Sequence, residues 1–441
     1  MDTFYNFINI HILVSLTLNS MNRDEQGQQK DGHFGGVRRG RHSSQSLKAA
    51  IRGSSLYREL LGAPSIRTGL IADLADRLGA DHLRGEFPPD LIAQVLTFML
   101  EKTEREKARA EQRRIPGRKK PERAATEPSA EVDADLPGAT GDPAAADGGS
   151  ASADPGEGTA AVAPDGILVF PWSVPEIRWY CAAIQAMQAE GLAPQQWPAQ
   201  LRVRRQELRQ TLNDTVDIAL AGRTAVMGAI PDLLQVDAAL SVAHEITTHA
   251  LAPELDWFTA QDDLRLRGAG HINTTEFSSG TFYRFAAVNL RQLQLNLGFL
   301  SSVGDEEPPA GRRRALEIAA HLVRLFALVH PAGRQANGAA YNPAHLVLVT
   351  LGELPLNLAN AFERPVTADP DGGFMLPSVM ALHTHWAQVH RGYGVRERAG
   401  EWRLDAEDGA EDAVDGITTC ATFARLQEWV ENVGMSPCAN A

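Results

Sequence analysis

The alternation of apolar and polar positions near the start of the chain predicts a β-strand. In "NFINIHILV" (6–14) β-branched residues recur at every second position. A period of two with this composition is typical of a strand that is well buried on one face. The following residues, 19–42, contain Asn, Asp and Gly at short intervals, and this punctuation predicts a long loop.

Helical spacing of leucine and isoleucine begins directly after that loop. A helix is predicted from Ser43 or Ser44 to Gly62, because a serine N-cap precedes the periodic apolar residues. Further helical patterns occupy 65–79 and 88–110. The chain therefore continues from a strand into a mainly helical block.

Composition changes sharply between 119 and 166. This segment consists mainly of Pro, Ala, Gly and Asp and has almost no large apolar residue. Such a segment cannot bury enough surface to offset the entropy of ordering, so we expect a disordered insert.

The second half of the chain adds strands and a long helix. Helices are predicted at 200–213 and 312–330, and strands at 241–249, 280–290 and 344–351. Without the inserted blocks, the order is strand, helix, strand, strand, helix, strand. This is the split βαβ order of a ferredoxin-like sandwich. The predicted fold class is therefore α+β.

The net charge of −13 does not exclude a nucleic-acid partner, because the acidity is local. Residues 124–165 hold nine acidic residues and 404–416 hold six, with no Lys or Arg in either stretch. Removing those fifteen charges leaves a remainder of about +2.

The cysteines and apolar runs point to an intracellular protein. Cys181, Cys420 and Cys438 form no CxxC pair, which excludes a disulfide framework and a thiolate zinc site. The apolar N-terminus carries Asp2 where a signal peptide has positive charge, and no later run is long enough to span a bilayer. We expect a soluble, cytoplasmic protein with no membrane partner.

The stretch "FGGVRRGRHSSQSLKAAIR" (34–52) contains the candidate ligand-binding residues. It contains five Lys or Arg and no acid. Gln45, Lys48 and Arg52 fall on one face of the predicted helix, beside first-turn N–H groups that favour an anion. The approaching segment adds the guanidinium groups and hydroxyls of Arg38, Arg39, Arg41, Ser43 and Ser44. A phosphate-binding surface is predicted, and a capped helix with a solvated polar face is the alternative.

Enzyme and base-reading motifs are missing. There is no P-loop and no RNP1 signature, so phosphates would be held through the backbone without base reading. In "HEITTH", His244 and His249 are five residues apart, whereas a zincin needs a spacing of four. His383 and His385 could share a face, but no third ligand is nearby. We therefore expect no catalytic residue, metal or cofactor.

Several long stretches resemble one known family. In order along the chain they are "FINIHIL", "LNSMNRDEQGQQKDGHFGGVRRGRHSSQSLK", "VDIALAGR", "VDAALSVAHEITTH", "DWFTAQDDL", "TEFSSGTFYRFAAVNLRQLQLNLG", "YNPAHLVLV" and "LANAFERPV". They are similar to the CasC family, the backbone subunit of the type I-E CRISPR surveillance complex Cascade, which belongs to the RAMP superfamily. The resemblance covers nearly everything outside 103–165 and 400–416, and the insert at 119–166 and the acidic "DAEDGAEDAVD" depart from it.

The resemblance implies a fold and a set of partners. It implies a modified RRM or ferredoxin-like palm (1–62, 236–249 and 281–441), helical fingers (63–235) and a β-hairpin thumb (250–280). Copies of such a subunit form a helical filament along CRISPR RNA, together with other Cascade subunits. The guide bases stay free to pair with target DNA, so sequence reading is left to base pairing.

The resemblance also implies functional residues. The family's RNA-gripping positions match Arg23, Lys30, Ser43, Gln45, Lys48 and Arg52. At the thumb, "DWFT" supplies Trp257, Phe258 and Thr259 as candidates for displacing a base. Adjacent residues of a strand point to opposite sides, so we expect Phe258 nearer the RNA and Trp257 as the anchor.

A second basic surface is predicted in the fingers. Arg202, Arg205 and Arg209 share one face of the helix expected at 200–213. The family's fingers carry a basic helix that contacts duplex DNA, so these are candidate DNA contacts. A solvated helix face is the alternative.

Two other functions remain open at this stage. Backbone subunits of related type III complexes cut RNA with an aspartate after the first strand, and Asp24 or Asp31 could take that role. Against it, Asp24 suits a turn in which it bonds its own backbone. The other alternative is a stand-alone single-stranded RNA-binding protein that forms no filament.

Overall fold

The computed structural model describes residues 5–100, 169–225, 229–261, 269–405 and 414–435. The predicted insert (119–166) and most of the acidic segment (404–416) lie outside these residues.

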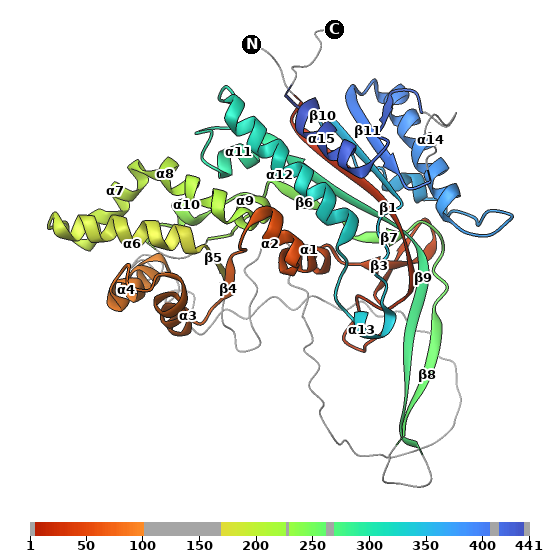
Figure 1. Ribbon diagram of the computed structural model, residues 1–441, viewed down its shortest axis with the longest axis horizontal. Helices are drawn as coiled ribbons and strands as arrows, with labels where there is room; N and C mark the ends of the chain where they lie inside the picture. The colour runs from red at the N-terminus through yellow and green to blue at the C-terminus, as the bar shows by residue number, and fades with distance from the viewer. Residues whose placement is uncertain (1–4, 101–168, 226–228, 262–268, 406–413, 436–441) are drawn as a thin grey trace, which may run out of the picture.

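One large mixed sheet forms the centre of the described chain (Figure 1), and the fold is therefore mixed α+β, as predicted. Its ten strands run in the order β12-β11-β10-β1-β9-β7-β3-β2, with β6 and β8 also paired to β9. The strands are β1 (Phe7–Asn19), β2 (Asp31–Phe34), β3 (Val37–His42), β6 (Leu240–Val242), β7 (Glu245–Thr247), β8 (Glu254–Gln261), β9 (Ala269–Asn289), β10 (Leu346–Gly352), β11 (Glu397–Arg403) and β12 (Ile417–Thr419).

The strands predicted from the sequence lie together at the centre of this sheet. β1 pairs antiparallel with β10 on one side and with β9 on the other, and β6 and β7 pair with β9. The predicted strand at 241–249 is thus two short strands. Across the sheet the order is β10, β1, β9 and β7, and these are the fourth, first, third and second strands of the predicted order.

Helices cover both faces of the sheet (Figure 1). The isoleucines at positions 8, 10 and 12 pack toward α12 (Pro309–Leu328) and α15 (Phe423–Val433). Leu13 packs on the opposite face, against α14 (Met375–Tyr393). The predicted burial of the isoleucine face of β1 is confirmed, and α14 covers the second face as well.

The predicted first helix is two helices. α1 (Ser44–Gly53) and α2 (Ser55–Leu61) meet at Ser54, whose side chain accepts from the N–H of Tyr57 and caps α2. The C-cap of α2 is Gly62, where the predicted helix ends.

The expected loop at 19–42 contains a β-hairpin. β2 and β3 are joined by Gly35 and Gly36, both with positive φ (61° and 78°), which suits a two-residue primed turn. A Cβ on Gly35 would lie 1.6 Å from the carbonyl oxygen of Glu363, so only glycine fits there. Gly35 therefore serves the protein's own packing, and Gly36 serves the turn. The polar residues that flank these glycines gave no strand signal.

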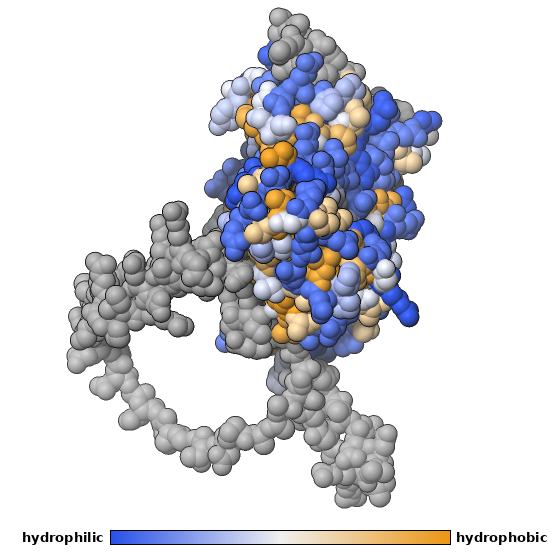
Figure 2. Space-filling model, turned by 90° about the vertical axis from the view of Figure 1, so that its left-hand side faces the viewer, coloured by the Kyte–Doolittle hydropathy of each residue, from blue (hydrophilic) through white to orange (hydrophobic). Residues whose placement is uncertain are grey.

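A helical unit extends from the sheet and has its own hydrophobic core (Figure 1). It contains the two-stranded pair β4 (Ile66–Thr68) and β5 (Phe170–Trp172), and α3 (Ile71–Arg77), α4 (Pro89–Leu100), α6 (Val174–Ala189), α7 (Trp197–Val203), α8 (Arg205–Gln210) and α10 (Pro231–Leu234). The predicted helix at 65–79 thus begins with a strand, and the one at 200–213 is broken at Arg204. Figure 2 faces this side of the molecule, where the surface is mainly hydrophilic and apolar atoms form small groups.

A long hairpin projects from the other end of the sheet (Figure 1). β9 is 21 residues long, and its first half pairs with β8 while its second half pairs with β1. The hairpin therefore continues directly from a central strand. Among the described residues, no helix is long and apolar enough to cross a membrane.

Candidate nucleic-acid interface

The N-terminus of α1 is shaped by buried serines. The Ser43 side chain caps the helix by accepting from the N–H of Ser46 at 3.2 Å, and Ser44 donates its backbone N–H to Nδ1 of His244 at 3.0 Å. Both serines are 2% exposed. Their burial gives them a local structural role, and it does not support their predicted contacts with phosphate.

The predicted face of α1 is present. Gln45, Lys48 and Arg52 are half-buried on one side of a regular helix. Arg52 donates from Nη1 to the carbonyl of Ser65 at 3.0 Å, which ties α1 to the start of the helical unit. The face therefore lies at the junction between the sheet and the helical unit.

Arg39 corrects the prediction. Its guanidinium is buried and donates to the carbonyls of Thr247, Phe362 and Phe34 at 3.1, 2.7 and 3.2 Å. Burial also lowers its pKa. Arg39 holds the hairpin to the body of the protein, and it has no surface with which to bind RNA.

Arg38 and Arg41 are less free than the sequence suggested. Arg38 is exposed and forms ion pairs with Asp31 and, at 3.5 Å, with Glu276 of β9. Arg41 donates to the carbonyl of Asp31 at 3.2 Å. The stretch 34–52 contains no acid, but the fold brings these carboxylates to it.

The loop before the hairpin presents the next two predicted residues. Arg23 is exposed and bridges to Gln29, and the backbone N–H of Lys30 donates to Asn22. Asp24 accepts from the N–H groups of residues 26 and 28 at 2.9 Å each, which closes the turn as its alternative role predicts.

A buried network of charged and polar groups supports this surface from beneath. Glu245 accepts from His42 at 2.6 Å and from Arg284 at 2.5 Å, and Arg284 contacts Nδ1 of His330 at 2.6 Å. His42 also reaches Asn19, at the end of β1. All these residues are at most 8% exposed. The network joins four strands directly below Ser43.

The electrostatics of the network fix its charge state. Burial alone would raise the pKa of Glu245, but Arg284 and His42 hold it at about 2. Burial, and then Arg284, lower the pKa of His330 to about 4. At neutral pH Glu245 is therefore ionised and His330 is neutral.

The histidines of "HEITTH" do not form a metal site. His244 accepts from Ser44, whereas His249 is buried, stacks on Phe374 at 3.7 Å and accepts from the N–H of Thr281. His383 lies on α14 and pairs with Glu401 at 2.6 Å. Within the described residues, no three His, Cys, Asp or Glu side chains gather to bind a metal.

The three fingers arginines lie on two helices, α7 and α8, and all three contact the segment 232–235. Arg202 forms a bidentate pair with Asp232 at 2.9 Å, and Arg205 donates to the carbonyl of Asp232 at 2.8 Å. Arg209 is half-buried and donates to the carbonyl of Gln235, and burial lowers its pKa to about 10. Arg209 thus has a structural contact that its predicted role did not include, while Arg202 and Arg205 remain exposed.

The hairpin β8–β9 reverses one expectation. Trp257 and Phe258 are consecutive residues of β8, paired in register with Thr274 and Asn273 of β9. However, Trp257 is 70% exposed and anchors nothing. The side chains of Phe258 and Thr259 lie outside the described residues.

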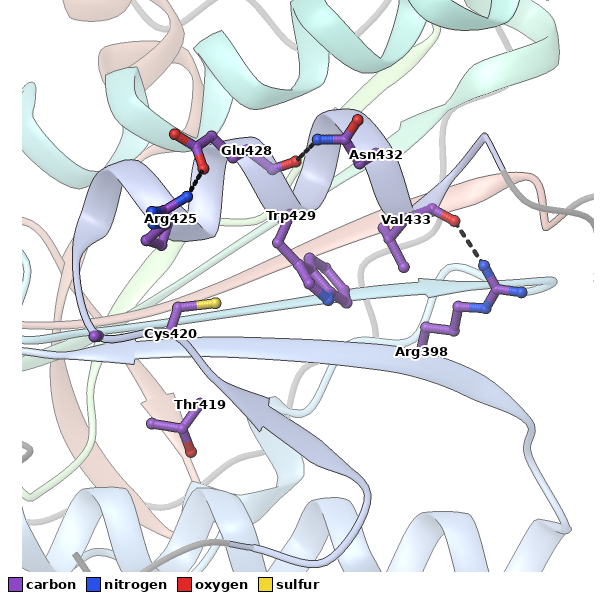
Figure 3. A pocket seen from close by; sticks show the side chains of 9 residues that line it. Arg398, Thr419, Cys420, Arg425, Glu428, Trp429, Asn432 and Val433 are labelled. Carbon is purple, nitrogen blue, oxygen red and sulfur yellow. Dashed lines mark hydrogen bonds and ion pairs between the residues drawn. The ribbon is translucent and has the colours of Figure 1, made fainter. Parts of the chain in front are cut away.

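A hollow of about 620 Å³ lies between α15 and strands β11 and β12 (Figure 3). Its cations are already paired: Arg425 with Glu428 at 2.6 Å, and Arg398 with the carbonyl of Val433 at 2.7 Å. None of the predicted site residues lines it. It therefore does not resemble an anion site.

Sequence reasoning missed one cation, Arg334. It stands just before α13 (Gln335–Gly338) and donates from Nη1 to Oγ1 of Thr275 at 2.8 Å. Its backbone is left-handed, with φ 49°. No local sequence signal marks this residue, because its position depends on contacts between distant segments.

These observations define an α+β protein with a cationic surface around the start of α1, beside a long projecting hairpin. The chain matches the model of the CT1975-like protein family (Cas_CT1975) over residues 8–432, and it belongs to that family.

Two solved structures are similar to this chain in fold. A chain described as part of a CRISPR RNA-guided surveillance complex, pre-nicking, matches with a TM-score of 0.64 and 23% identity, covering 97% of this chain and 100% of that one. A second, from a CRISPR RNA-guided surveillance complex, matches with a TM-score of 0.50 and 19% identity, covering 97% and 99%. At these identities the likeness concerns the fold. No curated protein matches the chain.

Proposed function

We propose that this chain is the guide-RNA-binding backbone subunit of a type I-E CRISPR surveillance complex. Several copies would polymerise along the CRISPR RNA with other Cascade subunits, and the guide bases would pair with target DNA. In this proposal the sheet is the ferredoxin-like palm, the helical unit is the fingers, and β8–β9 is the thumb. Such a subunit works inside the cell and needs no cofactor.

The arrangement around α1 carries the proposal. Gln45, Lys48 and Arg52 share one face of α1, and their side chains carry the proposal, because the first-turn N–H groups of Ser44 and Ser46 already donate to His244 and Ser43. Arg23 and Lys30 come from the preceding loop. These groups suit a sugar-phosphate backbone, and none is placed to read bases. The exposed Trp257 supports a hairpin that meets RNA or a neighbouring copy.

Charge reversal tests the proposal. The variant Lys48→Glu/Arg52→Glu should lose the guide during purification at moderate salt, because phosphates would then meet like charge. The control Arg391→Glu/Arg396→Glu makes the same change in net charge at exposed positions on and after α14, beyond the opposite face of the sheet. Retention of RNA by the first variant, with a control that behaves normally, would contradict the proposal.

The nuclease alternative finds less support. The carboxylate of Asp24 is used by its own turn, and Asp31 is paired with Arg38. Incubating the assembled protein with labelled complementary RNA and a divalent metal should give no regular cuts. Gel filtration with and without guide RNA separates a filament from a stand-alone RNA-binding protein.

A further inference from the structure

Two arginines from distant parts of the chain meet beside the root of the β8–β9 hairpin. The turn containing α13 packs directly on the end of β1 and the loop that follows (Figure 1). A Cβ on Gly333 would lie 2.2 Å from the carbonyl oxygen of Met21, and Nε2 of Gln335 contacts the sulfur of Met21 at 3.0 Å. These contacts make Arg334 a neighbour of Arg23, two residues beyond Met21.

Arg334 is held in an unfavourable backbone conformation. A residue with a Cβ in the left-handed region costs about 1–2 kcal/mol. Strain of this kind persists only where the surroundings impose it, and it is common at ligand-binding sites. The neighbouring Gly333 packs closely on Met21.

The two arginines have no acidic partner among the described residues. Neither forms an ion pair with any carboxylate in the part of the chain that the structure describes. Arg334 is half-buried, and burial followed by the charge of Arg23 lowers its pKa. Two adjacent guanidinium groups without a carboxylate favour an anion between them.

Arg334 also contacts the hairpin. Its Nη1 donates to Oγ1 of Thr275, which is 9% exposed and pairs in register with Asp256 of β8. Thr275 thus lies near the root of the hairpin. Any ligand that immobilises Arg334 would also fix this end of the hairpin.

We propose that Arg23 and Arg334 together bind one phosphate of the RNA backbone, and that Thr275 couples this binding to the position of the β8–β9 hairpin. The inference rests on the proposed function, and it adds a binding residue and a conformational link to it. When RNA is absent, the like charge of Arg23 opposes the contact of Arg334 with Thr275. When a phosphate is bound, Arg334 is fixed and the hairpin becomes ordered with it.

Affinity for single-stranded RNA tests the phosphate contact. Arg334→Asn removes the charge but keeps a residue that tolerates the left-handed conformation. It should weaken binding about tenfold and reduce the salt slope by about one unit. Arg391→Asn, at an exposed site on α14, is the matched control and should bind like the wild type.

Hydrogen exchange at saturating RNA tests the link to the hairpin. RNA should protect residues 254–261 and 269–280 in the wild type. Thr275→Val should bind RNA within about twofold of the wild type, since it keeps both arginines, but should lose that protection.

Wild-type affinity and salt slope in Arg334→Asn, or full hairpin protection in Thr275→Val, would overturn the inference. Either result, together with loss of RNA from Lys48→Glu/Arg52→Glu, would leave the proposed function standing. Failure of the wild type to bind RNA would overturn both. Melting temperatures of all variants would confirm that they are folded.

Discussion

The central sheet and the helical unit contain similar ion pairs in opposite surroundings. In the sheet, Glu245 and Arg284 meet at 2.5 Å with side chains 0% and 2% exposed. In the helical unit, Arg202 and Asp232 meet at 2.9 Å with side chains 47% and 44% exposed. The two distances are similar, but the free energies should differ, because removing one partner of a buried pair leaves an uncompensated charge away from water.

The difference also separates structural charges from charges that can bind a ligand. The guanidinium groups of Arg39 and Arg284 donate hydrogen bonds to carbonyl and carboxylate groups inside the protein. Arg23 and Arg205 keep exposed guanidinium groups. Sequence alone treats all four as equal positive charges, whereas the fold assigns only the second pair to the surface.

The largest effect should come from the buried pair. Glu245→Ala should lower the free energy of unfolding by about 3–5 kcal/mol, because Arg284 stays buried without its partner. Urea denaturation measures this, with Glu353→Ala at an exposed site after β10 as the control. The double variant Glu245→Leu/Arg284→Met should recover part of the loss. A loss below about 1 kcal/mol in Glu245→Ala would show that the buried pair behaves like a surface pair.

The pH dependence of stability should report the same buried region. His11 and His330 are buried, and burial lowers the pKa of each to about 4 from 6.5. A depressed pKa contributes stability that is complete above pH 6.5 and is lost as pH falls toward 4. Each histidine should therefore cost about 1.4 kcal/mol between pH 7.5 and pH 5.5.

Urea midpoints at those two pH values check this expectation. His11→Gln and His330→Asn should each flatten the profile, while His33→Gln, at an exposed site, should leave it unchanged. Glu245 should add no pH dependence in this window, since its pKa of about 2 in the folded state and its ordinary value of 4.5 both lie below it. A wild-type profile that is flat between the two pH values would contradict the assignment.

Much of the sheet was predictable, because its apolar periodicity is local. The strands near 7–14 and 344–351 and the helix at 312–330 were predicted close to their observed positions, and the strand predicted at 280–290 is the second half of β9. The β2–β3 hairpin was not, because its residues are mostly polar and Gly35 packs against Glu363, far along the chain. The two glycines correctly indicate a turn, but the residue that Gly35 packs against is more than 300 positions away.

The candidate site was predictable only in part for the same reason. Helical spacing placed Gln45, Lys48 and Arg52 on one face correctly. It could not show that Arg39 is buried, because its acceptors come from residues 34, 247 and 362. Residues that bind through local helix geometry can be predicted, and residues whose environment comes from distant strands cannot.

The turn of the hairpin offers a matched pair of variants with a smaller effect. Gly35 and Gly36 both have positive φ, so alanine is strained at either site. Only at Gly35 would the new Cβ meet Glu363, next to the carbonyl that holds Arg39. Gly35→Ala should therefore cost about 1–3 kcal/mol more than Gly36→Ala in urea denaturation. Equal losses would mean that the contact with Glu363 relaxes freely.

The smallest effect should come from the exposed pair of the helical unit. Arg202→Ala, Asp232→Asn and the double variant form a cycle whose coupling energy should be about 0.2–1 kcal/mol, because solvent screens both charges. Asp232→Asn also removes the partner that competes with DNA for Arg202. If Arg202 contacts duplex DNA in the assembled complex, Asp232→Asn should bind DNA somewhat faster at low salt, and the gain should disappear as salt is raised. The control is Glu86→Gln, which frees Arg178 from an equally exposed pair elsewhere in the helical unit. An equal gain in both variants would reflect net charge alone, and a coupling energy above about 2 kcal/mol would remove the distinction between the two regions.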